Sequence, residues 1–499
     1  MELQYEKNTL RALAESVGDV RSTELTQEIK LPDGMPDIGR VLTGWGQPVI
    51  RSKEWSRDEI LLSGGVTVWT LYVPEDGTEV RSMETWLPFQ MKWDVPQDIP
   101  EGVIRVAPRI RFVDSRGISA RKMMLRAGIS VQMQAFNCRE TELFTPLDAG
   151  ADVELLRRCY PVRVPVEAGE RTFHLDEELN LPENVPDAEK ILCAVLCPEV
   201  TDRKVLDDKL LFKGHGNLHL IYRCSEGNVR VWDHDVPFSQ FAELDGSYAP
   251  DAGADICLAV TDMDTDLAEP GTIRLKAGLV GQYLVDERKM LELTEDAYSP
   301  FREVEPVMGK LKTPAILEDI SERIDVRQSI SGQEGQCVDV WMYADYPRIR
   351  RHGGDVELEI PGVFQMLYYA PDESLRAASM RWEGRVQMHA DENVTIRTRI
   401  PACVKVEGTR TAEGIALSGQ MPLQIRTTSD TDFPMVTGLS IGDIRQEEEI
   451  RPSVVLRRMG EGGLWELAKS CGSTVAAILS ANDLQSEPVD NRILLIPVV

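Results

Sequence analysis

Three histidines lie close together near the middle of the chain and could ligate a metal. His215 and His219 flank Gly216-Asn217-Leu218 on one predicted strand, so their side chains point to the same face, and His234 follows one hairpin later. A zinc site requires neutral imidazoles that converge with a third and usually a fourth ligand. Because two histidines on one strand are more typical of a surface pair, we expect no metal here.

Cys193 and Cys197 form a second candidate pair, for redox or metal chemistry. Their spacing places both side chains on one face of either a helix or a strand. The nine cysteines of the chain include no Cys-x-x-Cys pair, which argues against a disulfide framework or a four-cysteine zinc site and favours a reducing cytoplasm. We therefore expect Cys193 and Cys197 to be small core residues.

The densest basic stretch of the chain could dock a phosphate group or an acidic partner. It consists of Arg105, Arg109, Arg111, Arg116, Arg121, Lys122 and Arg126. Over residues 104–113 apolar and charged residues mostly alternate, with the period of a half-buried antiparallel strand. A solvated strand face is therefore the simpler interpretation, and the missing interleaved aromatic residues argue against single-stranded nucleic acid.

Motifs that would identify an enzyme are missing from the sequence. It contains no phosphate-binding Gly-x-x-x-x-Gly-Lys-Ser/Thr loop, no Gly-x-Ser-x-Gly elbow and no His-Glu-x-x-His helix. Nothing singles out a catalytic pair among the 82 Asp and Glu residues. We expect a non-enzymatic protein without a cofactor; a hydrolase would need a cleft with a perturbed carboxylate pair.

The elements that position these residues belong to an internal repeat with a period of 150 residues. The heptapeptide Leu-Pro-x-x-x-Pro-Asp at 31–37 returns in related form at 181–187, and Leu-x-Ala-Gly at 125–128 returns at 275–278. Proline presets the backbone angle φ, and Asp after Pro suits a turn or helix start. We therefore interpret the heptapeptide, with Asp37 and Asp187, as the entrance of each copy rather than a ligand site.

A third, more diverged copy lacks the heptapeptide and has Tyr346-Pro347 where Pro48 and Pro198 stand. Alternating strands with turn signals between them predict antiparallel β structure, a sandwich or barrel for each copy. The acidic, Pro-rich stretches 149–171 and 286–310 are typical of connectors. The predicted organisation is an N-terminal helical segment at 1–19, copies at 20–145, 170–298 and 320–430, a linker at 431–452 and a module at 453–499.

The C-terminal module has the predicted order strand, helix, helix, strand. Leu464, Leu467 and Ala468 stand at i, i+3 and i+4 of the first helix, Ser473-Thr474 caps the second, and residues 493–497 form the closing strand. We expect the core of the module to contain Trp465, Leu467, Ile478 and Ile496.

The module resembles a LysM domain. The resemblance rests on Leu-Trp-x-x-Ala, Gly-x-Thr-Val, Ile-Leu-x-x-Asn-x-Leu and the terminal Leu-x-Ile-Pro. It implies binding of N-acetylglucosamine glycans through the loops before the first and after the second helix. Here Glu461-Gly462-Gly463 replaces the Gly-Asp-Thr/Ser of the first loop, which favours a protein ligand. The candidate contact residues are Glu461, Gly462, Gly463, Leu464, Ser486, Glu487, Pro488 and Asn491.

With the module placed, the copies resemble the SPOCS domain of endospore-forming bacteria. The whole chain is similar to spore coat morphogenetic proteins of the SipL type. That resemblance implies a coat assembly protein of the mother-cell cytoplasm, at the forespore surface, whose LysM domain binds the coat ATPase, stage IV sporulation protein A, or another coat protein. The alternative is a peptidoglycan-binding protein of the cell wall or cortex.

Charge and composition agree with a folded protein that avoids polyanions. The 499 residues include 55 Lys and Arg against 82 Asp and Glu, a net charge of −27. Such a chain repels nucleic acid and anionic lipid unless a local basic patch overrides the mean field. The first residues are charged, and no run of about 18 apolar residues occurs. We expect no export signal, no transmembrane segment and no nucleic-acid partner.

Overall fold

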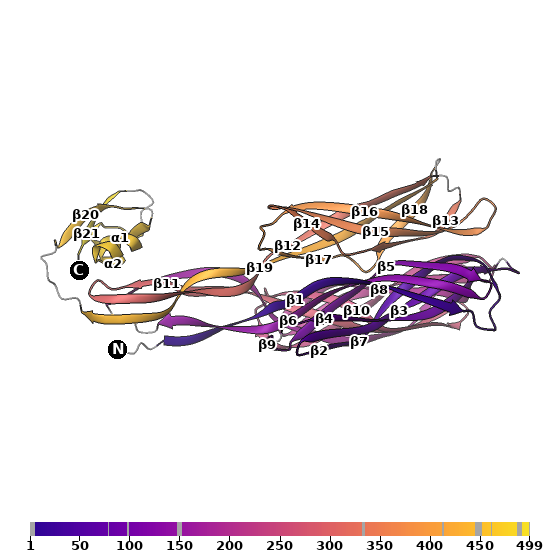
Figure 1. Cartoon of the computed structure of the whole chain (residues 1–499), viewed down its shortest axis with the longest axis horizontal. Helices are drawn as coiled ribbons and strands as arrows, with labels where there is room; N and C mark the ends of the chain where they lie inside the picture. Colours follow the sequence, from indigo (N-terminus) through magenta and orange to yellow (C-terminus); the bar gives the residue numbers. More distant parts are fainter. Residues whose placement is uncertain are drawn as a thin grey trace.

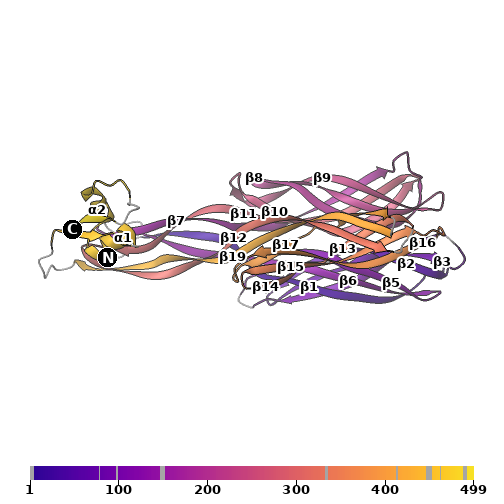
Figure 2. The same cartoon turned by 90° about the horizontal axis from the view of Figure 1, so that it is seen from above.

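The structure is a computed structural model that describes residues 5–77, 79–96, 99–146, 152–331, 335–411, 414–444, 452–460, 462–486 and 492–498. Three bundles of long antiparallel strands lie side by side, and a narrow stalk connects them to a small terminal module (Figures 1 and 2). We call the bundles unit 1 (β1 to β6), unit 2 (β7 to β11) and unit 3 (β12 to β19).

Each of units 1 and 2 is built from two antiparallel sheets. The strands of unit 1 are β1 (Tyr5–Lys30), β2 (Ile38–Ser56), β3 (Glu59–Pro74), β4 (Arg81–Asp94), β5 (Val103–Ser119) and β6 (Lys122–Pro146), in the orders β1-β6-β5 and β2-β3-β4. Those of unit 2 are β7 (Glu154–Asn180), β8 (Ala188–Cys224), β9 (Val229–Tyr248), β10 (Gly253–Glu269) and β11 (Thr272–Tyr298), in the orders β10-β11-β7 and β8-β9.

Unit 3 joins its strands into one eight-stranded sheet, because β13 pairs with β18. The order is β12-β19-β18-β13-β15-β14, with β16 beside β15 and β17 beside β19. The strands are β12 (Arg302–Ser331), β13 (Gln336–Ala344), β14 (Arg348–His352), β15 (Asp355–Tyr369), β16 (Leu375–His389), β17 (Thr395–Arg399), β18 (Val404–Thr411) and β19 (Gly414–Ile444).

Units 1 and 2 share the strand register that the 150-residue period predicts. Lys30 pairs with Lys122 in unit 1, and Asn180 pairs with Thr272 in unit 2. The heptapeptide forms a turn after the first strand in both units. The hydroxyl of Tyr72 donates to the carbonyl of Pro36 at 3.2 Å in unit 1, and that of Tyr222 donates to the carbonyl of Pro186 at 3.4 Å in unit 2. The period therefore reflects backbone pairing.

The first and last strands of each unit extend beyond the bundles as two-stranded ribbons, and the three ribbons form the stalk (Figures 1 and 2). Its apolar core contains Leu10, Ala12, Val162, Val164, Leu291, Leu293, Leu311 and Met435. The predicted N-terminal helix is therefore wrong. Residues 9–14 alternate outside and inside as part of β1, because pairing with β6 and burial in the stalk outweigh local helix propensity.

The stretches predicted to be connectors also belong largely to the stalk. Residues 154–171, 286–298 and 302–310 lie in β7, β11 and β12, and β19 continues through residues 431–444 of the predicted linker. Many of their acidic and basic side chains face solvent, as in the pair Arg157 and Glu292, whereas Asp286 is buried. A solvated ribbon and a linker have similar compositions, so composition alone misplaced these boundaries.

Glutamine side chains join the units by pairing with strand backbones. Gln282 of unit 2 both accepts from the amide of Val106 and donates to its carbonyl, at 2.8 Å each. Gln47 of unit 1 accepts from the amide of Leu196 of unit 2 at 2.8 Å. These buried contacts satisfy backbone groups that have no neighbouring strand. The bundles consequently pack as one body with a shared core.

A disulfide between Cys197 of β8 and Cys403, just before β18, links units 2 and 3. The expectation of two reduced core cysteines is right for Cys193, which is free and buried, and wrong for Cys197. The bond spans 206 residues of sequence, with the Cα atoms 5.9 Å apart. Sequence spacing could not predict the pairing, because packing between units brings the two residues together.

We expect denaturation without reductant to expose seven reactive thiols, and denaturation after reduction to expose all nine. Mass spectrometry after alkylation counts them. The variant Cys403→Ala should lose about 2–4 kcal/mol of stability under oxidising conditions, because the cross-link no longer restricts the unfolded chain. Under reducing conditions it should match the reduced protein. Nine reactive thiols before reduction would contradict the bond.

Candidate functional site

A buried cluster of charged side chains lies where the three units meet. Arg105 of β5, Asp255 of β10 and Arg399 of β17 come from three units, and each strand pairs with the last long strand of its unit. Asp255 Oδ2 lies 2.9 Å from Arg105 Nη2 and 2.6 Å from Arg399 Nη2. Burial alone would raise the pKa of Asp255, but Arg399 and Arg105 hold it well below its usual range. We call these three residues the junction triad.

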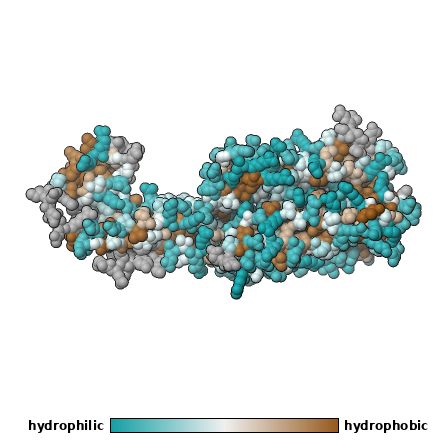
Figure 3. All heavy atoms as spheres, in the orientation of Figure 1, coloured by the Kyte–Doolittle hydropathy of each residue, from teal (hydrophilic) through white to brown (hydrophobic). Residues whose placement is uncertain are grey.

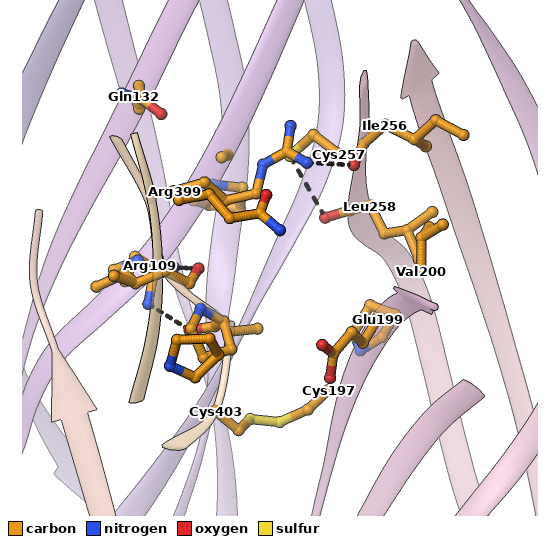
Figure 4. A pocket seen from close by; sticks show the side chains of 18 of the residues that line it. Arg109, Gln132, Cys197, Glu199, Val200, Ile256, Cys257, Leu258, Arg399 and Cys403 are labelled. Carbon is orange, nitrogen blue, oxygen red and sulfur yellow. Dashed lines mark hydrogen bonds between the residues drawn. A yellow bond between two sulfur atoms is a disulfide. The ribbon is translucent and has the colours of Figure 1, made fainter. Parts of the chain in front are cut away.

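A cavity of about 350 Å³ opens beside the junction triad, and we call it the junction pocket. Figure 4 shows Arg109 and Arg399 on one side, Glu199 and Val200 on the other, and the Cys197–Cys403 disulfide along the base. All three units contribute to its walls. A cavity of this size is within the range of small-ligand pockets, and several cations line it.

The basic stretch 105–126 is not the solvated face that its alternation predicts. Arg105 and Arg109 are buried, with 4% and 7% of their surface exposed. Arg121 binds the heptapeptide turn, donating to the carbonyls of Pro32 and Met35 at 2.7 and 2.5 Å. The packing of units 2 and 3 against β5 buries the charges of Arg105 and Arg109. The stretch is therefore divided among structural contacts, the junction pocket and surface ion pairs such as Arg116 with Asp114.

The histidines also differ from the expected surface pair. His219 is buried between units 2 and 3, with Nδ1 2.7 Å from Asp233 and Nε2 3.3 Å from Asp339. Burial alone would lower the pKa of His219, but Asp339 and Asp233 raise it to about 10. His215 lines the junction pocket, and His234 stacks on Trp232 at 4.8 Å between ring centroids. His219 therefore serves as a cationic link between units.

The terminal module contains β20 (Val454–Arg458), α1 (Gly463–Cys471), α2 (Val475–Ala481) and β21 (Ile493–Pro497). Its two strands pair antiparallel, and Thr474 caps α2 by accepting from the amide of Ala477 at 3.0 Å. Ile478 and Ile496 are buried as expected, whereas Trp465 and Leu467 are only partly buried.

Trp465 instead attaches the module to the end of the stalk. Its indole Nε1 donates to Asp296 at 2.8 Å, and its ring meets Tyr298 edge-on at 4.7 Å between centroids. Tyr298 also donates to the carbonyl of Ser473 at 3.0 Å, and Lys469 forms an ion pair with Asp296 at 2.6 Å. The module is therefore held on β11.

The predicted contact loops are described only in part. Glu461, Glu487, Pro488 and Asn491 lie outside the described residues. Gly462 and Ser486 are exposed and Gly463 is half-buried with φ at 69°, whereas Leu464 is 1% exposed and belongs to the core of the module. Leu464 therefore does not belong to a contact surface, because it faces inward from the first turn of α1.

Sequence reasoning missed an apolar surface on the module. Val454, Leu456, Ile493 and Leu495 are 46%, 66%, 61% and 37% exposed. Leu456 pairs directly with Leu495 on the face of the two-stranded sheet that points away from the helices, and brown atoms gather on the module in Figure 3. We call these four side chains the outer sheet patch. The unbroken apolar run at 493–496 was the available signal, since a strand with one covered face should alternate.

Among the described residues, no cluster of three or more His, Cys, Asp or Glu side chains could hold a metal ion. Neither helix in this part of the chain has the length and apolar character needed to cross a bilayer.

The protein is mainly antiparallel β structure with a small helical module that carries an exposed apolar patch. The family model described as SipL, SPOCS domain matches residues 187–268 of the chain, from the end of the second heptapeptide to β10. This match supports a relationship to SipL-type proteins and a sporulation-related role. No curated protein and no solved structure matches the chain.

Proposed function

We propose that the protein is a non-enzymatic assembly protein of the spore coat or envelope and that its terminal module, a LysM-type domain, binds a protein partner. The outer sheet patch carries this proposal. Exposed aliphatic side chains that cluster on one face are typical of a protein contact surface. Glycan sites use polar groups at fixed positions, for which the patch offers no equivalent.

The match of residues 187–268 to a SPOCS domain supports the setting. In that setting the three units are SPOCS-type β copies, and the module faces the coat morphogenetic ATPase, stage IV sporulation protein A, at the forespore surface in the mother-cell cytoplasm. The stalk places the module away from the bundles (Figure 1). A partner can therefore engage the module while the units contact other coat components.

We expect the double variant Leu456→Glu/Leu495→Glu to lose at least about tenfold in affinity for the purified ATPase, because each carboxylate places a charge in an apolar contact. Deletion of residues 453–499 should abolish capture. The matched control is Val307→Glu, which places the same charge at a 56% exposed apolar position on the stalk. Surface plasmon resonance with the immobilised ATPase measures all four proteins.

Capture that survives the deletion would overturn the proposal. Loss on deletion but not in the double variant would move the contact to the loops around Gly462 and Ser486. Sedimentation with purified peptidoglycan tests the alternative function: retention that depends on residues 453–499 would favour a cell-wall or cortex glycan as the ligand.

A further inference from the structure

The junction pocket contains a buried cation without a counter-ion. Arg109 is 7% exposed, and its terminal nitrogens donate to the carbonyls of Ala344, Ile400 and Pro401 at 3.3, 2.5 and 2.7 Å. Its Nε is buried and has no hydrogen-bond partner. Across the described chain, no carboxylate forms an ion pair with it, in contrast to Arg111 on the same strand, which pairs with Asp345 at 2.9 Å.

Positive charge predominates in the whole pocket, although the protein carries a net charge of −27. The cations of the lining are Arg105, Arg109, Arg203, Arg399 and Lys405, and Glu199 is the carboxylate among the lining residues. Outside the lining, Asp255 of the junction triad lies behind Arg105 and Arg399, and Asp235 lies 3.9 Å from the ammonium group of Lys405, which leaves Arg109 as the buried cation without a carboxylate among the described residues. Burying an unpaired charge costs several kcal/mol, so an excess of cations in one cavity indicates an anion that completes the balance.

The neutral groups of the lining fit the same ligand. Gln132 and Gln134 of β6 and Gln424 of β19 line the pocket, and their side-chain amides can donate hydrogen bonds. The Nε of Arg105 is also buried without a partner. Guanidinium groups bind carboxylate and phosphate oxygens through paired hydrogen bonds, which are stronger than those between neutral groups.

We propose that the junction pocket binds a small oxyanion, a molecule that carries phosphate or carboxylate groups and fits a cavity of about 350 Å³. Units 1, 2 and 3 all line the pocket, so the bound anion contacts each of them and strengthens their packing. The proposal rests on the pocket alone and is independent of the terminal module and its partner.

The test is isothermal titration calorimetry of the full chain with sodium pyrophosphate and, separately, with sodium citrate, at constant ionic strength. Wild-type protein should bind at least one of them saturably with one site. The variant Arg109→Gln should bind at least about tenfold more weakly, because it loses charge-assisted hydrogen bonds. The control Arg116→Gln changes an exposed arginine on the same strand and should bind as wild type does.

A second variant distinguishes loss of binding from loss of folding, because it leaves the buried Arg109 unchanged. Arg203 and Lys405 are exposed lining residues, so Arg203→Gln/Lys405→Gln should fold normally and still bind about tenfold more weakly. Binding of pyrophosphate alone would identify a phosphate ligand, and binding of citrate alone a carboxylate ligand. The proposal would be overturned if neither anion bound saturably, or if all variants bound with equal affinity. It would also be overturned if the protein bound an acidic peptide, hexaglutamate, but neither of the small anions.

Discussion

Replacement of Asp255 by alanine should lower the free energy of unfolding by about 3–5 kcal/mol. The carboxylate is the shared partner of Arg105, which is 4% exposed, and of Arg399. Without it, the guanidinium groups of Arg105 in unit 1 and Arg399 in unit 3 lose the carboxylate that they share. Because the triad joins all three units, urea unfolding followed by circular dichroism should also show an earlier first transition.

The matched control for this change is Asp264→Ala, which removes an exposed carboxylate from the same strand, β10. It should change stability by less than about 0.5 kcal/mol. The double variant Asp255→Ala/Arg399→Met should recover part of the loss, since it also removes one of the two guanidinium groups that lost their carboxylate partner. A loss below about 1 kcal/mol for Asp255→Ala would show that water or a shift of the backbone compensates for the missing partner.

The second large effect concerns His219, whose pKa is raised to about 10 by Asp339 and Asp233. A histidine that titrates near 6.5 when unfolded and near 10 when folded contributes its full stability below about pH 6.5. The contribution declines as the pH rises through 10. We therefore expect His219→Gln to cost about 3–5 kcal/mol at pH 6, because the buried Asp339 loses its cation.

The measurement is the difference in unfolding free energy between wild type and His219→Gln, from urea unfolding at several pH values between 6 and 10.5. Other groups titrate in both proteins, so the difference isolates His219. It should shrink steadily as the pH rises. His389→Gln is the control, since His389 is exposed beside Asp355 at 3.6 Å and should show no such trend. A difference that stays constant across this range would contradict a protonated His219.

The sequence pattern predicted local structure well where each residue depends mainly on its neighbours. Alternating residues gave strands in β5, the heptapeptides gave turns, and the terminal module has the expected order of two strands and two helices. The sequence Leu-Pro-Phe at 87–89 returns as Val-Pro-Phe at 236–238, one residue short of the 150-residue period. The strand pairing has the same one-residue slip, because Gly64 faces Phe89 and Gly214 faces Phe238. These features follow from periodicity and turn chemistry, which act over short distances.

The sequence by itself determined the strands, the turns and the 150-residue register of this protein, because backbone pairing follows local alternation. Only the tertiary structure decided that residues 9–14 extend into a stalk, that Cys197 meets Cys403, and that Arg109 lies buried without a counter-ion. Each of these depends on residues more than a hundred positions away, which come together only when distant strands pair within a unit and the three units pack against one another.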